Sequence, residues 1–313
     1  MDFHLSEDQQ ALVDAVQAIL RDHADLPQAE RLSYAWHDPA LQALLAENGF
    51  LDAARSMGPL EAALVAFETA RSLRSIEAMG SGLVAPMALP DRMVEGPVAL
   101  AAERDLGRAI RNLTVARTLL VDCGEDSIVL PVDPGAVEQV ASILGYPYGR
   151  FARAPDPASG QRIAGGGALL RQWWRTGIAT EIAGAARAAI DFTIDHVTQR
   201  QVFGRAVGSF QAVQHRLVQR HGHARSTCYL AMRAAWSARA GDADIAVCHA
   251  LLGIQPLLFD LHQFNGGMGV TTEHSLHFWT YRIRALQAEA GGLAGAALDI
   301  ADRRWPAVEG ANG

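Results

Sequence analysis

Aromatic residues are scarce in this chain of 313 residues, at 7%, and charged residues are few, at 19%. Apolar residues make up 50% of the sequence, and alanine is abundant among them. A chain with so few aromatic and many small apolar side chains favours close-packed helices over a β-sandwich. The length is enough for two or three small domains, each with a buried core.

Cysteine is also rare: Cys123, Cys228 and Cys248 form no CxxC pair. This spacing predicts reduced thiols in a cytoplasmic protein. The acidic, polar start MDFHLSEDQQ does not resemble a signal peptide, and charges interrupt the long apolar runs, so we expect no membrane span. The formal net charge of −7 argues against nucleic acid or an anionic membrane as the main partner.

Several common site motifs are missing. The sequence has no GxGxxG after a strand, no GxxxxGK[ST] and no GxSxG. These absences leave a nicotinamide-binding fold, a P-loop and a nucleophile elbow without support. His221 and His223 point to different faces of a helix and are expected to be solvated, and His274 with His277 has no evident third ligand, so we predict no metal site.

Three regions with different hydrophobic patterns follow each other along the chain. Residues 1–92 show helical periodicity, with a Ser-x-x-Gln capping box at Ser6. Residues 93–166 contain the strand-like runs VALAA, VARTLLVDC and SIVLPVD, separated by turns, and end at a GGG joint that we expect to be flexible. Residues 167–313 read as long helices with short connections. The predicted fold is mainly α, with a reduced central β domain and a C-terminal four-helix bundle.

Two polar, glycine-containing segments stand between the long helices. RQVFGRAVGSFQAVQHRL begins at Arg200, with Ser209 as the expected cap of the next helix, and HQFNGGMGVTTEH begins at His262. An arginine at a helix end can hold a phosphate through two hydrogen bonds, and glycines let a backbone approach a nucleotide closely. Spacing alone leaves the alternative of two ordinary interhelical turns open.

Together these segments resemble the acyl-CoA dehydrogenase family. RQVFGRAVGSFQAVQ is similar to its R-x-x-F-G…Q segment, HQFNGGMGVTTEH to its Q-x-x-G-G-x-G segment, and MDFHLSEDQQALVDAV to its usual opening. The order of helical domain, β domain and bundle also matches. The resemblance implies FAD as cofactor and an acyl-CoA as substrate. In this family, such segments reach the diphosphate and adenosine end of an FAD held mainly by a neighbouring subunit. That role would fall to Arg200, Phe203, Gly204, Gln211, Gln263, Gly266 and Gly267.

The chain also departs from the family pattern. The central region is short and lacks the usual loop and strand that hold the flavin ring. The family's catalytic glutamate follows the glycine motif, but that position holds Ala290, with Glu289 one residue away and rotated by about 100° on a helix. An alternative base position on the first bundle helix falls near Trp174, with Glu181 two turns further on. Glu289 is a weak candidate for a displaced base.

Three interpretations remain. The chain could be a homomeric dehydrogenase that uses Glu289, a subunit of a heteromer, or a non-catalytic scaffold. We favour the heteromer, in which a longer acyl-CoA dehydrogenase subunit supplies the β domain and the base, because the residues that serve a neighbour's flavin are kept. The resemblance is to the short chains of α2β2 dehydrogenases that act on sterol or bile-acid side chains.

Overall fold

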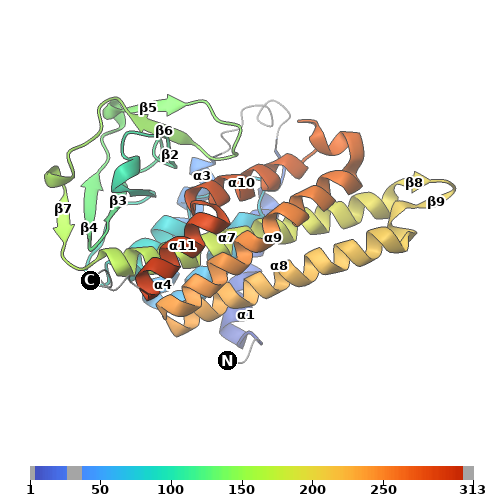
Figure 1. The fold of residues 1–313 in the computed structure, drawn as a ribbon, viewed down its shortest axis with the longest axis horizontal. Helices are drawn as coiled ribbons and strands as arrows, with labels where there is room; N and C mark the ends of the chain where they lie inside the picture. The colour runs from blue at the N-terminus through green and yellow to red at the C-terminus, as the bar shows by residue number, and fades with distance from the viewer. Residues whose placement is uncertain (1–3, 27–36, 306–313) are drawn as a thin grey trace, which may run out of the picture.

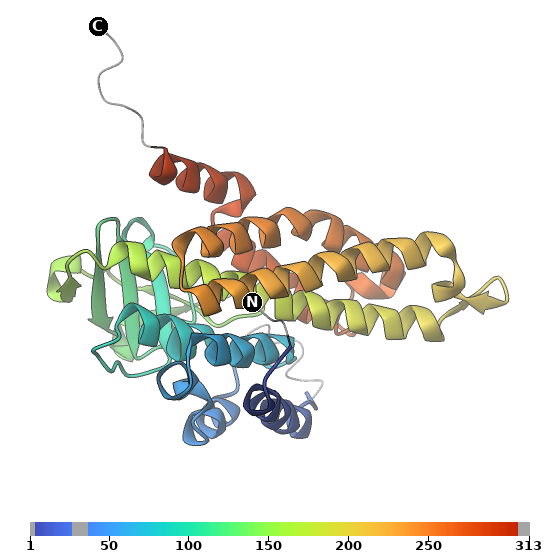
Figure 2. The ribbon, with the colours of Figure 1, turned by 90° about the horizontal axis from the view of Figure 1, so that it is seen from below.

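The computed structural model describes residues 4–26 and 37–305. Figure 1 shows a long helical bundle with a small β domain at one end, and Figure 2 shows the N-terminal helices as a layer along one face of the bundle.

The N-terminal layer consists of short helices. Ser6 and Gln9 form the capping box of α1, with both reciprocal hydrogen bonds present. Pro59 stands in the first turn of α5, which packs against α7 and α8. A short π-helical stretch, η2, leads from this layer toward the first strand. The elements are α1 (Glu7–Asp22), α3 (Pro39–Glu47), η1 (Phe50–Asp52), α4 (Ala53–Ser56), α5 (Pro59–Arg71), η2 (Met79–Val84) and α6 (Ala85–Ala88).

The central domain contains two sheets around a core of its own. One has the order β1-β3-β4-β7, with β1 and β3 parallel and the other pairs antiparallel; the other has the antiparallel order β2-β6-β5. The strands are β1 (Val98–Ala102), β2 (Ile110–Arg111), β3 (Thr118–Cys123), β4 (Asp126–Pro131), β5 (Val137–Val140), β6 (Tyr148–Phe151) and β7 (Gln161–Ile163). The three apolar runs of the sequence correspond to β1, β3 and β4; the other four strands are short and carry no clear alternation, so periodicity did not reveal them.

The bundle is made of long helices with short connections. α7, α8 and α9 pack against one another, α10 packs mainly on α7, and α11 lies outside this group, against α9 (Figure 2). The elements are α7 (Gly167–Gln199), β8 (Gln201–Val202), β9 (Arg205–Ala206), α8 (Gln211–Ser237), α9 (Ala240–Asn265), η7 (Gly266–Val270), α10 (Leu276–Glu289) and α11 (Gly292–Arg304). One hydrophobic core joins the N-terminal layer and the bundle and reaches β1.

The segment Ala240–Val270 is long and apolar enough to cross a membrane by length and composition. However, 56% of its most apolar window is buried inside the molecule, as in the core helix of a bundle. The packing of α9 against α7 and α8 therefore explains the buried part of this apolar character.

Two expectations from the sequence are wrong. The GGG segment is not a free joint, because Gly167 donates its N–H to the carbonyl of Glu125 and a Cβ at this position would overlap the carbonyl oxygen of Gly124. His223 is not simply solvated: its ring stacks on that of His249, with the centroids 4.2 Å apart. Both contacts join residues that the local pattern does not relate.

Close packing between the layers depends on Gly184 in the middle of α7. A Cβ at this position would overlap the carbonyl oxygen of Phe67 on α5. We therefore expect Gly184→Ala to lower the free energy of unfolding by about 1–3 kcal/mol, although alanine is the better helix former. Gly222→Ala is the matched control, because a Cβ there meets nothing within 4 Å, and it should raise stability by about 0.5–1 kcal/mol. Urea unfolding of the two variants measures the difference; equal effects would contradict the close-packing explanation.

Candidate functional site

The first polar segment forms a hairpin at the far end of the bundle from the β domain (Figure 1). Arg200 ends α7, and the two-residue turn between β8 and β9 consists of Phe203 and Gly204, with φ values of 53° and 78°. Two positive φ values in succession match the twist of a two-residue hairpin. A positive φ is unfavourable for a bulky residue, so the backbone of Phe203 is strained. The Phe203 side chain is 93% exposed, so its apolar character has no explanation in the packing of residues 4–26 and 37–305.

The glycine-rich segment is fixed to α7 by a buried amide. The side chain of Asn265, the last residue of α9, is fully buried and donates to Thr193 Oγ1 and to the Leu261 carbonyl, each at 2.8 Å. The chain then turns through Gly266, which has a φ of 61°. A Cβ on Gly266 would lie 3.6 Å from Nη1 of Arg200, so the two motifs meet in space. Sequence reasoning missed Asn265 and Thr193, which hold this arrangement in place.

The seven residues predicted to contact FAD lie in these two turns and the first turn of α8. All are exposed except Gly266, which is half-buried. Within residues 4–26 and 37–305, the side chains of Arg200, Gln211 and Gln263 make no hydrogen bond or ion pair, so their polar groups are available to a ligand. Their role in binding FAD stays a prediction.

The predicted cap of α8 is wrong in detail. Phe210, not Ser209, is the N-cap residue, and no side chain caps this helix. The Ser209 hydroxyl donates instead to the Ala206 carbonyl, which tightens the turn after the hairpin. The backbone N–H groups in the first turn of α8, which begins at Gln211, therefore have no side-chain acceptor among the described residues.

A buried charge cluster occupies the junction between the β domain and the bundle. Arg111, on β2, donates from Nε and Nη2 to the two carboxylate oxygens of Glu289 on α10, at 2.6 and 3.1 Å, and from Nη1 to Glu181 on α7, at 3.0 Å. The three side chains are only 6–12% exposed. The Arg111 guanidinium lies over the Tyr146 ring, with its Cζ atom 4.7 Å from the ring centroid. We call Arg111, Glu181, Glu289, Tyr146 and Trp174 the junction cluster.

Burial sets the protonation of the junction cluster. It raises the pKa of Glu181 to about 7, against the opposing attraction of Arg111. The pKa of Arg111 lies well above its usual range, since the attraction of Glu181 and Glu289 outweighs desolvation. Arg111 is therefore a permanent cation, and Glu181 titrates near neutrality.

Both base positions considered from the sequence converge on this cluster. Trp174 donates from Nε1 to Oε1 of Glu289 at 2.5 Å. Both carboxylate oxygens of Glu289 thus already accept hydrogen bonds, which leaves this carboxylate poorly placed to remove a proton. In the described part of the chain, the void lined by Glu77, Met79, Arg111 and Glu289 does not admit a water-sized sphere.

Comparison with known proteins identifies relatives of this chain. Residues 171–304 match the family model "Acyl-CoA dehydrogenase, C-terminal domain". The chain is 27% identical over 305 residues to the acyl-CoA dehydrogenase IpdE2 of Mycobacterium tuberculosis, covering 88% of this chain and 91% of that protein. Residues 171–304 therefore correspond to an acyl-CoA dehydrogenase C-terminal domain, and the chain as a whole is similar to proteins of that family. This similarity supports an acyl-CoA dehydrogenase oxidoreductase with FAD as its cofactor.

Solved structures extend the likeness of the fold over the whole chain. The ChsE4–ChsE5 complex from Mycobacterium tuberculosis matches with a TM-score of 0.76 and 22% identity, covering 97% of this chain and 99% of that one. A steroid acyl-CoA dehydrogenase, Tcur3481–Tcur3483, matches with a TM-score of 0.79 and 19% identity, covering 95% and 97%. The short β domain therefore belongs to a recurring architecture.

The residues present fit FAD at one end of the molecule only. Arg200, Gln211 and Gln263 present two amides and a guanidinium beside backbone that glycines leave accessible, which suits a diphosphate and a nucleoside. The junction cluster, by contrast, is buried, and the void beside Arg111 and Glu289 does not admit a water-sized sphere, so it has no room for a flavin ring. Bound FAD supplies hydride chemistry in this family, but this chain's own junction has no room for the reacting ring.

The raised pKa of Glu181 predicts a pH-dependent stability. Because the pKa of Glu181 is about 7 in the folded state and near the ordinary glutamate value of 4.5 in the unfolded chain, the folded state binds more protons between these pH values. The stabilisation is fully present below the lower value and is lost as the pH rises through the higher one. Glu181→Gln should flatten the decline of unfolding free energy between these pH values by up to about 1.4 kcal/mol per pH unit. Urea unfolding at several pH values in this range measures the change. The control is Glu47→Gln, at an exposed carboxylate, which should keep the wild-type dependence of unfolding free energy on pH. An unchanged pH dependence in Glu181→Gln would contradict the raised pKa of Glu181.

Proposed function

We propose that this chain is one subunit of a heteromeric, FAD-dependent acyl-CoA dehydrogenase that introduces a double bond between the α and β carbons of an acyl-CoA thioester. A longer dehydrogenase subunit supplies the ring-binding β domain and the catalytic base. This chain supplies contacts to the diphosphate and adenosine end of the partner's FAD. The observation that carries the proposal is the contrast between the buried junction cluster, which leaves no water-sized space beside Arg111 and Glu289, and the distal residues, which are exposed and unpaired within the described part of the chain.

The charges at the distal end support the proposed contact with the FAD of a partner subunit. Arg200 is an exposed cation at a helix end, without a carboxylate partner among the described residues, and Gly266 leaves the backbone beside it open. A diphosphate from another subunit would meet a guanidinium and the uncapped start of α8. Phe203, 93% exposed at the hairpin tip, would be covered by the same subunit.

An exposed apolar stripe on α9 supports packing against another subunit. Ile245, Leu252 and Phe259 are spaced by seven residues, on one face of the helix, and are 49%, 60% and 59% exposed. Val270, beyond the end of the helix, is 72% exposed. A row of large apolar side chains of this kind marks an interaction surface rather than a solvated face. The stripe leads toward the glycine-rich turn, so subunit contact and flavin contact would be continuous.

The proposed substrate is the CoA ester of a sterol or bile-acid side chain, and the proposed assembly is α2β2. The relative with a TM-score of 0.79 is described as a steroid acyl-CoA dehydrogenase, and the ChsE4–ChsE5 structure is described as a complex of two chains. These similarities support the substrate class and the heteromer by analogy of the whole fold, since the acyl group itself leaves no signature in the described residues.

Flavin content tests the proposal directly. We expect the chain expressed alone to carry little or no flavin, and co-expression with a longer acyl-CoA dehydrogenase subunit from the same gene neighbourhood to restore FAD at less than one per chain. In the complex, Arg200→Ala should weaken flavin retention by about tenfold or more, since a charge-assisted hydrogen bond contributes roughly 1.5–3 kcal/mol. Arg225→Ala, at another exposed arginine on α8, is the control. Stoichiometric, tightly bound FAD in the lone chain would refute the heteromer.

The role of Glu289 distinguishes a partner base from a displaced base. A positioned general base contributes about 10²–10⁴-fold to the rate. Because Arg111 and Trp174 already occupy both carboxylate oxygens, we expect Glu289→Gln to lower the turnover of the assembled complex by less than about tenfold, normalised to bound flavin. A thermal melt of the same sample separates lost stability from lost chemistry. Abolished flavin reduction by an acyl-CoA, in a variant that still assembles, would make this chain the catalytic subunit.

A further inference from the structure

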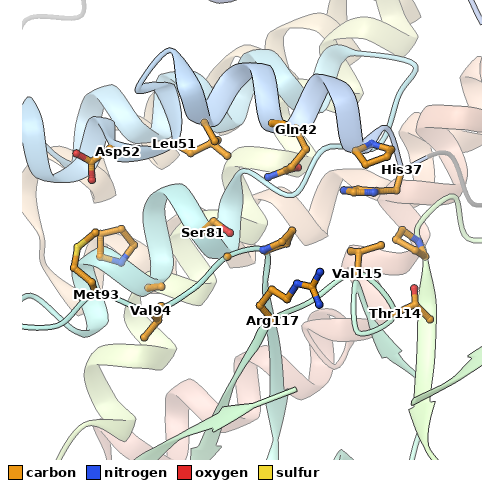
Figure 3. A pocket seen from close by; sticks show the side chains of 18 of the residues that line it. His37, Gln42, Leu51, Asp52, Ser81, Met93, Val94, Thr114, Val115 and Arg117 are labelled. Carbon is orange, nitrogen blue, oxygen red and sulfur yellow. The ribbon is translucent and has the colours of Figure 1, made fainter. Parts of the chain in front are cut away.

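A second, open pocket lies between the N-terminal layer and the β domain. Its volume is about 910 Å³, within the range of small-molecule sites. As Figure 3 shows, α3 and η1 form one wall, with Gln42 on α3 and Leu51 on η1, and Ser81, Val115 and Arg117 lie opposite. The pocket is separate from the junction cluster: η2 divides them, with Ser81 lining the pocket and Met79 contacting Arg111.

Helix α3 has two different apolar faces. Leu41 and Leu45 are fully buried in a core with Ile76 and Ala78, whereas Ala43 and Ala46 line the pocket. A helix needs only one apolar face to anchor it to a domain, so the second face has no role in holding α3 in place. Its side chains are small, and that leaves the volume open.

The pocket wall is fixed before any ligand arrives. The Gln42 side chain donates to the Glu77 carbonyl at 2.9 Å and accepts from the Glu77 N–H at 2.7 Å. The Ser81 hydroxyl donates to the buried Glu77 carboxylate. The guanidinium of Arg55, which also lines the pocket, already donates hydrogen bonds to the carbonyls of Leu89 and Pro90. Preformed walls of this kind are typical of ligand sites.

Polar groups without partners gather at one end of the pocket. Arg117, Thr114 and His37 lie at the same end in Figure 3, and Asp52 lies toward the other. Hydrogen bonds between the backbones of Arg117, Pro97 and Val132 hold the arginine in position, yet its guanidinium has no hydrogen bond or ion pair among the residues that the structure describes. The His37 Nε2 atom is buried and also has no hydrogen-bond partner among these described residues, while its ring lies next to the Gln42 side chain.

We propose that this pocket binds an amphipathic organic monoanion, with an apolar ring system beneath Ala43 and Ala46 and an oxyanion against Arg117. The apolar middle of the pocket, contributed by Leu51, Ala85 and Pro86 among others, takes the body of the ligand. The guanidinium provides two parallel donors for a carboxylate, sulfonate or phosphate-type group, and Thr114 and His37 lie beside it. The site depends on neither the flavin nor the partner subunit.

A matched pair of fluorescent probes tests the proposal on the full chain. Anilinonaphthalene sulfonate and phenylnaphthylamine share the same aromatic body, and only the first carries an anion. We expect the sulfonate to bind at one molecule per chain and about tenfold more tightly than the neutral probe. Arg117→Gln should remove that difference and leave the affinity for the neutral probe unchanged. Arg153→Gln, at another exposed arginine of the β domain, should change neither affinity.

Filling the pocket provides an independent test. Ala43→Phe should abolish saturable binding of both probes, because the ring would occupy the apolar middle, while Ala40→Phe, on an exposed part of α3 outside the lining, should leave binding intact. Equal unfolding midpoints for these two variants show that the fold is unchanged. Equal affinities for the two probes in the wild type would overturn the proposal. So would binding that survives Ala43→Phe, because the probes would then occupy another surface, such as the stripe on α9.

Discussion

The contact between Arg111 and two buried carboxylates determines how the domains of this protein sit together. The guanidinium comes from a two-residue strand of the β domain, and its partners come from two different bundle helices. Removing one member of such a group leaves an uncompensated charge in a dry interior, which costs several kcal/mol, on the order of 3–5. One cation between two carboxylates leaves a negative excess, and the raised pKa of Glu181 relieves it near neutral pH. The cluster therefore holds the β domain against α7 and α10 at a fixed separation.

That fixed separation makes the two ends of the bundle chemically different. Near the β domain, the junction cluster brings together buried charges, two aromatic rings and the end of α10, and the void beside Arg111 and Glu289 does not admit a water-sized sphere. At the opposite end, the hairpin and the glycine-rich turn present unpaired polar groups and an exposed phenylalanine. The second end has its own anchor, since the buried Asn265 amide ties the glycine turn to Thr193 of α7. A chain built in this way offers binding groups outward while its own interior is closed.

The stretch η2 links the junction cluster to the second pocket. Its residues alternate between the two spaces: Met79 faces Arg111, and Ser81 faces the pocket beneath α3. The buried carboxylate of Glu77, just before η2, holds the stretch together through the N–H groups of Gly80, Ser81 and Val98. The same few residues therefore close one space and form the floor of the other, through backbone hydrogen bonds rather than through the packing of large side chains.

The sequence by itself determined the features that depend on neighbours a few residues apart. The capping box at Ser6, the helical periodicity of the bundle and three of the longer strands all arise from local backbone and side-chain preferences. The order of the motifs was also enough to suggest the family. Tertiary structure alone decided the junction cluster, because Arg111 lies 70 residues from Glu181 and 178 residues from Glu289 in the chain. The same holds for the Asn265–Thr193 anchor and the His223–His249 stack. From the sequence alone, a charged or amide side chain is expected to lie in water. Only the tertiary structure buries it and supplies the hydrogen-bond partner that makes its burial stable.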